Sequence, residues 1–130
     1  MSPVELLRSS SLSDSVPYAY ASRVGELVLT AGACPLDDAG EVVAPGDVTA
    51  QATRVMANLV TALADAGCRL EDVARTTVYV ASSDRADLVA AWEVVRAAFG
   101  DHDAPSTLLG VALLGYPDQL VEVEAIAARR

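Results

Sequence analysis

Lysine is missing from this sequence, so all nine of its positively charged side chains are arginines. Without lysine the chain cannot form a Schiff base with a carbonyl substrate or hold pyridoxal phosphate through one. The arginines are outnumbered by 18 acidic residues, and the formal net charge is −9. A chain of this charge offers no basic stripe that could displace the counterions of a phosphate backbone. We therefore expect a small-molecule substrate and no nucleic-acid partner.

Cysteine and histidine are scarce as well, with Cys34, Cys68 and a lone His102. Two isolated cysteines cannot form a disulfide framework, and they suit a reducing compartment, so a cytoplasmic protein is expected. With one histidine they are too few for a zinc site, and we expect no metal. Residues 1–7 lack the pattern of a signal peptide, and no apolar stretch reaches transmembrane length. We expect no membrane partner.

Apolar residues, in contrast, make up 52% of the chain. A length of 130 residues fits one domain spanning residues 1–130. A domain of this size has much surface per unit volume, so this apolar fraction exceeds what one core needs. The surplus predicts a subunit interface and an oligomeric protein.

Two predicted strands near the C-terminus, at residues 106–114 and 120–127, are the most informative stretch. The first is a nearly continuous apolar run, which is typical of a strand covered on both faces. The second alternates, so Glu122 and Glu124 share one face with aliphatic residues. Carboxylates on a buried face need a partner or hydrogen bonds. We expect the chemistry at this face.

The rest of the chain predicts two helices and four further strands. One helix begins after Asp47 as N-cap and stops at Gly67, and the other begins near Ser83 and ends at Gly100. Alternating or apolar runs predict the strands at residues 4–8, from residue 17 through Tyr20, at 27–30 and at 75–80. This order predicts an α+β sandwich with both helices on one face of a mixed sheet. The other face is left for another subunit.

A series of motifs covers nearly the whole chain from Tyr18 onward. They are Pro17-Tyr18, Val24 through Gly32, Pro35, Gly40, Gln51 through Leu59, Ala66-Gly67, Leu70 through Val73, and the ending Val121 through Ala127. With their spacing, these motifs resemble the Rid (YjgF-like) family. The resemblance implies a chorismate-mutase-like fold assembled as a homotrimer, with clefts between subunits. It also implies hydrolysis of reactive enamines and imines to ketoacids without a cofactor.

One position departs from the family. The best-known members hold the substrate carboxylate with an arginine in a Pro-x-Arg-Ser/Thr motif, and this chain reads Pro105-Ser106-Thr107. We interpret Ser106 as the residue at the arginine position. A hydroxyl cannot replace a bidentate guanidinium clamp. The family also often has asparagine on the second helix where this chain has Trp92.

Tyr18, Gly32 and Glu122 match the family. The match implies that Glu122 activates water or shuttles a proton, and the alternative is a solvated or salt-bridged edge carboxylate. Gly32 is expected where backbone comes close to a ligand. Tyr18 is expected either to hold a substrate oxygen or to be an interface aromatic.

Glu124 is expected to be structural, paired with an arginine such as Arg75 or Arg129. A nucleophilic pair of Cys34 with His102 is possible in principle, but a small buried cysteine is the commoner outcome.

Four further residues are expected at the cleft as candidates for substrate contact: Cys34, Trp92, Ser106 and Thr107.

Three functions remain open. The first is hydrolytic deamination of an imine or enamine, with Glu122 handling protons. The second is another acid–base reaction, such as cyclisation, dehydration or isomerisation in a biosynthetic pathway. The third is ligand binding without turnover.

Overall fold

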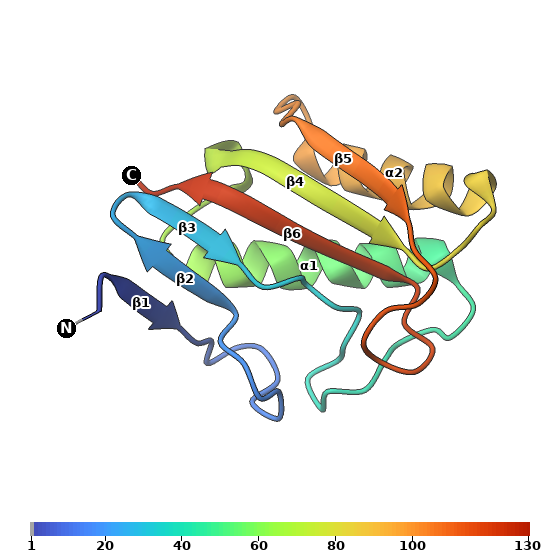
Figure 1. The fold of residues 1–130 in the computed structure, drawn as a ribbon, viewed down its shortest axis with the longest axis horizontal. Coiled ribbons are helices and arrows are strands. Elements are labelled where there is room, and N and C mark those ends of the chain that lie inside the picture. The colour runs from blue at the N-terminus through green and yellow to red at the C-terminus, as the bar shows by residue number, and fades with distance from the viewer. Residues whose placement is uncertain (1) are drawn as a thin grey trace.

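The computed structural model describes residues 2–130. Residue 1, the first of the residues 1–7 that lack the pattern of a signal peptide, lies outside the described part. The chain forms a six-stranded sheet with two helices on one face (Figure 1). The strands are β1 (Val4–Leu7), β2 (Ala21–Val24), β3 (Leu27–Thr30), β4 (Val73–Val80), β5 (Ser106–Gly110) and β6 (Val121–Ala128). The helices are α1 (Val48–Asp65) and α2 (Arg85–Phe99), with a short 3-10 turn, η1 (Leu70–Asp72), before β4.

The strand order is β1-β2-β3-β6-β4-β5. The pair β4–β5 is parallel, and the other neighbours in the sheet are antiparallel. The predicted α+β class, with a mixed sheet and both helices on one side, is therefore confirmed. The last strand, β6, lies in the middle of the sheet, between β3 and β4.

Both helices begin and end through local chemistry that the sequence predicts. The Asp47 side chain accepts a hydrogen bond from the amide of Ala50, which caps α1 as expected. Gly67, with φ of 82°, follows the end of that helix. The second helix begins slightly later than predicted, because Asp84 and not Ser83 provides the cap.

The two faces of β6 differ as the alternation predicts. Its helix-facing residues are buried and form the centre of the core: Val121, Val123, Ala125 and Ala127. Glu122 and Glu124 point to the opposite face and are half-buried. That face also carries exposed apolar side chains, with exposed fractions of 47% for Leu27 and 38% for Leu29. No element of residues 2–130 covers it.

Two predicted strands differ from the structure. The strand expected at 106–114 ends at Gly110, and the backbone at this glycine comes so close to β4's end that a Cβ would lie 2.8 Å from the carbonyl oxygen of Ser82. The apolar residues that follow leave the sheet, and Leu113 is 78% exposed. The strand expected from residue 17 begins only at Ala21, where pairing with Leu7 of β1 starts.

Candidate active site

The side chain of Glu122 lies directly on the backbone of Gly32. Beyond β3 the chain pairs with β6 once more in an antiparallel bridge, where Ala33 and Val123 exchange backbone hydrogen bonds of 2.7 and 3.2 Å. This bridge places Gly32 beside Glu122. A Cβ at position 32 would lie 2.1 Å from Oε2 of Glu122, so a side chain there would displace the carboxylate. The close approach expected of Gly32 is thus made by a side chain of the protein itself.

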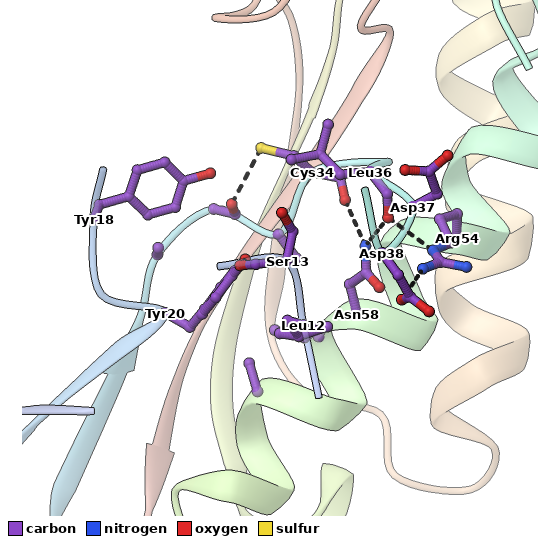
Figure 2. Close-up of a pocket in the computed structure, with 15 residues that line it drawn as sticks. Leu12, Ser13, Tyr18, Tyr20, Cys34, Leu36, Asp37, Asp38, Arg54 and Asn58 are labelled. Atoms are coloured by element: carbon purple, nitrogen blue, oxygen red, sulfur yellow. Dashed lines mark hydrogen bonds and ion pairs between the residues drawn. The ribbon is translucent and has the colours of Figure 1, made fainter. Parts of the chain in front are cut away.

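The other oxygen of this carboxylate, Oε1, has two donors. The amide Nε2 of Gln119 donates to it at 3.0 Å. Sγ of Cys34 lies 3.4 Å from it and also 3.4 Å from the carbonyl oxygen of Gly32, so these two acceptors share the single thiol proton (Figure 2). The three side chains come from β6, from the turn before it and from the segment after β3. Both contacts are made to Oε1, and Oε2 lies against Gly32.

Cys34 acts in this cluster as a protonated thiol. Burial, and then the negative charge of Glu122, raise the pKa of Cys34 to about 12. Since the thiolate is the nucleophile and the thiol is not, Cys34 near neutral pH is a hydrogen-bond donor. Its segment is held by α1, because Asn58 Nδ2 donates to the carbonyls of Cys34 and Leu36, each at 2.9 Å.

Tyr18 extends the cluster with a neutral phenol. Its hydroxyl lies 3.2 Å from that of Tyr116, and Figure 2 shows it directed toward the sulfur of Cys34. Burial, followed by the hydrogen bond with Tyr116, raises the pKa of Tyr18 well above its usual value. The phenol therefore stays protonated and can donate to a substrate atom.

Two hollows adjoin Tyr18. An enclosed one of about 20 Å³ is lined by the segment between β1 and β2, by the segment that follows β3, and by α1 (Figure 2). This volume suffices for a water molecule and not for a ketoacid. A shallower groove of about 410 Å³ lies outside it, lined by Tyr18, Leu29 and Thr30 among others. The groove opens beside the uncovered sheet face, and of these two hollows it is the one with the volume of a small molecule.

Ser106 does not belong to this site. It pairs in register with the buried Thr76, and the two hydroxyls are hydrogen-bonded on the helix-covered side of the sheet. Glu122 points to the other side. The interpretation of Ser106 as the arginine position is therefore wrong. Counted from Pro105, the Pro-x-Arg spacing reaches Thr107, whose hydroxyl lies on the open face and accepts a hydrogen bond of 3.3 Å from Arg75 Nη2.

Trp92 also lies away from Glu122 within this chain. Its side chain is partly buried against the core and borders a hollow on the helix side, together with Thr76, Phe99 and His102. His102, which borders the same hollow, gives its distance from Glu122 along the sheet. His102 Nε2 lies 2.8 Å from the carbonyl of Val73, at the far end of β4. Glu122 pairs with Tyr79 near the other end of that strand. Six residues at about 3.3 Å each separate the two ends by about 20 Å.

This separation excludes a Cys34–His102 nucleophilic pair, because Cys34 contacts Glu122. The expected partner of Glu124 is also wrong. Tyr79 donates its hydroxyl to Glu124 Oε1 at 2.7 Å, and the hydrogen bond raises the pKa of Tyr79. Arg75 instead contacts Thr107. Glu124 thus has a partner within the sheet, but this partner is a phenol and not an arginine.

Sequence reasoning missed Gln119 and Tyr116. Both lie in the turn that precedes β6, and Gln119 is 3% exposed. Strand alternation assigns residues to faces only along a strand, so it gives no signal for a turn residue that folds back on the strand it precedes.

Among residues 2–130, no group of three or more His, Cys, Asp or Glu side chains is placed to hold a metal ion. Neither α1 nor α2 has the length and apolar character needed to cross a bilayer, and the described residues contain no other long helix.

Comparison with known proteins adds the family context. Residues 9–129 match the model of the family described as Endoribonuclease L-PSP. A RutC family protein of Pyrococcus abyssi is 38% identical over 112 residues, 85% of each chain. A 2-iminobutanoate/2-iminopropanoate deaminase of Escherichia coli is 35% identical over 118 residues, 88% of each chain. The crystal structure of the YjgF gene product of Escherichia coli superposes with a TM-score of 0.82 at 30% identity, over 97% of this chain and 99% of the other.

Proposed function

The chain belongs to the Endoribonuclease L-PSP (YjgF/RidA/RutC) family, and on that premise we propose that it hydrolyses a small imine or enamine to a carbonyl compound and ammonia. The observation that carries the proposal is the placement of Glu122, with Oε1 engaged by two donors and Oε2 resting on Gly32. Relatives named as deaminases of 2-iminobutanoate, 2-iminopropanoate and 3-aminoacrylate support the reaction class.

Glu122 serves as the general base and then as the general acid. The substrate reacts as its N-protonated form. Glu122 takes a proton from water while the water oxygen bonds to the imine carbon and the C=N electron pair moves to the protonated nitrogen, which gives a neutral carbinolamine. Glu122 then gives that proton to the nitrogen. As the C–N bond breaks and ammonia leaves, the carboxylate takes the proton of the hydroxyl, which becomes the carbonyl, and this proton leaves with ammonia as ammonium. The neutral phenol of Tyr18 donates a hydrogen bond to the substrate, and the reaction needs no cofactor.

A nucleophilic mechanism is disfavoured by the chemistry of the cluster. The thiol with the raised pKa is protonated near neutral pH, and the lone histidine lies at the far end of β4. A nucleic-acid substrate is disfavoured by the net charge of −9, despite the family's description.

A second candidate function follows from Thr107. The open-face position that the family motif reserves for arginine holds a hydroxyl, beside the Arg75 guanidinium of the neighbouring strand. A hydroxyl anchors a carboxylate poorly, and in this structure the Arg75 guanidinium donates to that hydroxyl. This favours an acid–base reaction on a substrate that carries no carboxylate, such as a cyclisation, dehydration or isomerisation.

The two functions are separated by a pair of substrates. 2-Iminopropanoate, generated in place from alanine by an amino-acid oxidase, carries the carboxylate, and the acyclic imine that an amine oxidase generates from a simple primary amine does not. Faster hydrolysis of either imine than in buffer supports hydrolytic deamination. The ratio of the two rates shows how much the substrate carboxylate contributes to catalysis. If both decay only at the uncatalysed rate, imine hydrolysis is refuted and the second function takes its place.

We also propose that the protein assembles as a homotrimer through its open sheet face. The face carries exposed Leu27, Leu29 and Ile126, and no segment of residues 2–130 covers it. Three copies related by a three-fold axis would bury these side chains and enclose the groove beside Tyr18. Light scattering should give three times the mass of one chain, and Leu29→Asp should lower it. A monomer mass at micromolar concentration would refute the assembly.

A further inference from the structure

Gln119 is a buried amide whose orientation is fixed by its own hydrogen bonds. Its Oε1 accepts from the amide of Tyr116 at 3.1 Å. Its Nε2 donates to the carbonyl of Val121 at 3.1 Å and to Glu122 Oε1 at 3.0 Å. A flipped amide would face two acceptors with an oxygen and leave a backbone donor without a partner. The amide therefore presents a donor to Glu122.

The turn that carries Gln119 is itself held from α1. Gln51, fully buried on that helix, donates through Nε2 to the carbonyl of Asp118 at 2.9 Å and accepts from the amide of Leu120 at 2.8 Å. These two contacts flank Gln119 in the chain. They fix a turn in which Asp118 adopts a positive φ of 65°.

The second donor to the same carboxylate oxygen is held from the same helix. Asn58 of α1 binds the carbonyl of Cys34 at 2.9 Å, and the Cys34 thiol reaches Glu122 Oε1. One helix thus positions donors on two separate segments, and both donors meet one oxygen. Gly32 provides the space on which the other oxygen rests.

We propose that Gln119, assisted by Cys34, is the positioning residue that holds Glu122 for proton transfer, by engaging Oε1 so that Oε2 alone exchanges protons over Gly32. The inference rests on the proposed function and adds to it the residues that orient the base. Neither donor touches substrate in this scheme, and both act through Glu122.

The first test replaces the amide in two ways. Gln119→Leu removes the donor, and kcat should fall roughly tenfold to a hundredfold with little change in KM, because a base misplaced by about 1 Å loses that much. Gln119→Glu keeps the size of the side chain. At low pH the introduced carboxyl group is protonated and donates to Glu122, whereas at higher pH its charge repels Glu122.

The variant Gln119→Glu should therefore regain activity as pH falls, relative to wild type at each pH. A merely structural glutamine would not produce this crossover. The proposal would be overturned if Gln119→Leu had the same kcat as wild type, or if the pH profile of Gln119→Glu ran parallel to that of wild type. Thr76→Val is the matched control: it removes a buried hydrogen bond on the other face of the sheet and should lower stability without changing kcat.

The thiol is tested by a second pair. Cys34→Ser keeps a donor, and Cys34→Ala removes it, so kcat should be nearly retained in the first and fall severalfold in the second. Equal kcat values in the two variants would remove Cys34 from the proposal.

A readout without activity separates this inference from the proposed function. Crystal structures of wild type and Gln119→Leu should show the Glu122 carboxylate on Gly32 in the first and displaced or spread over several rotamers in the second. An unmoved carboxylate in Gln119→Leu would overturn the positioning role, whatever the substrate. If wild type hydrolyses no imine but the carboxylate moves, the proposed reaction fails and the positioning role stands.

Discussion

Glu122 and Glu124 occupy the same face of the same strand, two residues apart, and their surroundings have almost nothing in common. Glu122 meets donors from two loop segments and rests on a glycine. Glu124 accepts one hydrogen bond from Tyr79, on the adjacent strand, and borders an open hollow of about 320 Å³. The alternation of a strand gives both carboxylates the same direction, but only Glu122 also contacts side chains from loops that fold over the strand. The loops, and not the strand, therefore make the two positions different.

The largest expected effect separates the two carboxylates directly. Glu122→Gln keeps the shape of the side chain and removes its proton chemistry, so kcat should fall roughly a hundredfold or more. Glu124→Gln keeps an acceptor for Tyr79 and should leave kcat within about twofold. Turnover is measured on the best imine substrate, and light scattering checks that each variant keeps its assembly. Comparable losses in the two variants would contradict the distinction.

A change at Gly32 should disturb Glu122 without changing it. In Gly32→Ala the new methyl group occupies the place of Oε2, and the flexible end of Glu122 moves away, so the fold should persist while kcat falls roughly tenfold to a hundredfold. Gly115→Ala is the control, because a Cβ there meets nothing within 4 Å. The two variants should have similar melting temperatures, and a fully active Gly32→Ala would show that Oε2 does not need that position.

The smallest expected effect concerns the thiol that contacts Glu122 and not Glu124. Burial and the charge of Glu122 raise the pKa of Cys34 from an ordinary 9.0 to about 12. Over this interval the unfolded chain has lost the proton and the folded chain keeps it. The contribution of this proton to stability is therefore full below pH 9 and is lost as pH rises toward 12.

The melting temperature of wild type should fall over that interval, and more steeply than that of Cys34→Ser, whose hydroxyl does not ionise. Thermal unfolding at a series of pH values measures both slopes. Equal slopes would mean that the thiol is not held protonated by its surroundings.

Much of the fold was predictable because it depends on local patterns. Helical spacing and caps located α1 and α2, and alternation assigned the faces of β6. The error at β5 was one of alignment, because the Pro-x-Arg spacing counted from Pro105 already reaches Thr107 in the sequence. Its consequence is large, since a shift of one residue along a strand moves a side chain to the opposite face. Ser106 and Thr107 differ by that one residue. The apolar run after Gly110 looks like strand in the sequence, yet Leu113 is 78% exposed, and composition alone does not distinguish a core residue from an exposed one.

The site was predictable only in part. Resemblance to the family identified Tyr18, Gly32 and Glu122, and these residues do lie in one cluster. The buried amide of Gln119 was not predictable, because its contact depends on how the turn before β6 folds back. That turn is fixed by Gln51, nearly seventy positions earlier in the chain, and no local pattern links the two.

The most direct test of the central claim is the release of ammonia from 2-iminopropanoate at catalytic enzyme concentration, compared among wild type, Glu122→Gln, Glu124→Gln and buffer. We predict that wild type and Glu124→Gln release ammonia and pyruvate in equal amounts well above the uncatalysed rate. Glu122→Gln should lie close to the rate in buffer. Wild type that matches buffer both on this imine and on the imine without a carboxylate, or Glu122→Gln that matches wild type, would contradict the account.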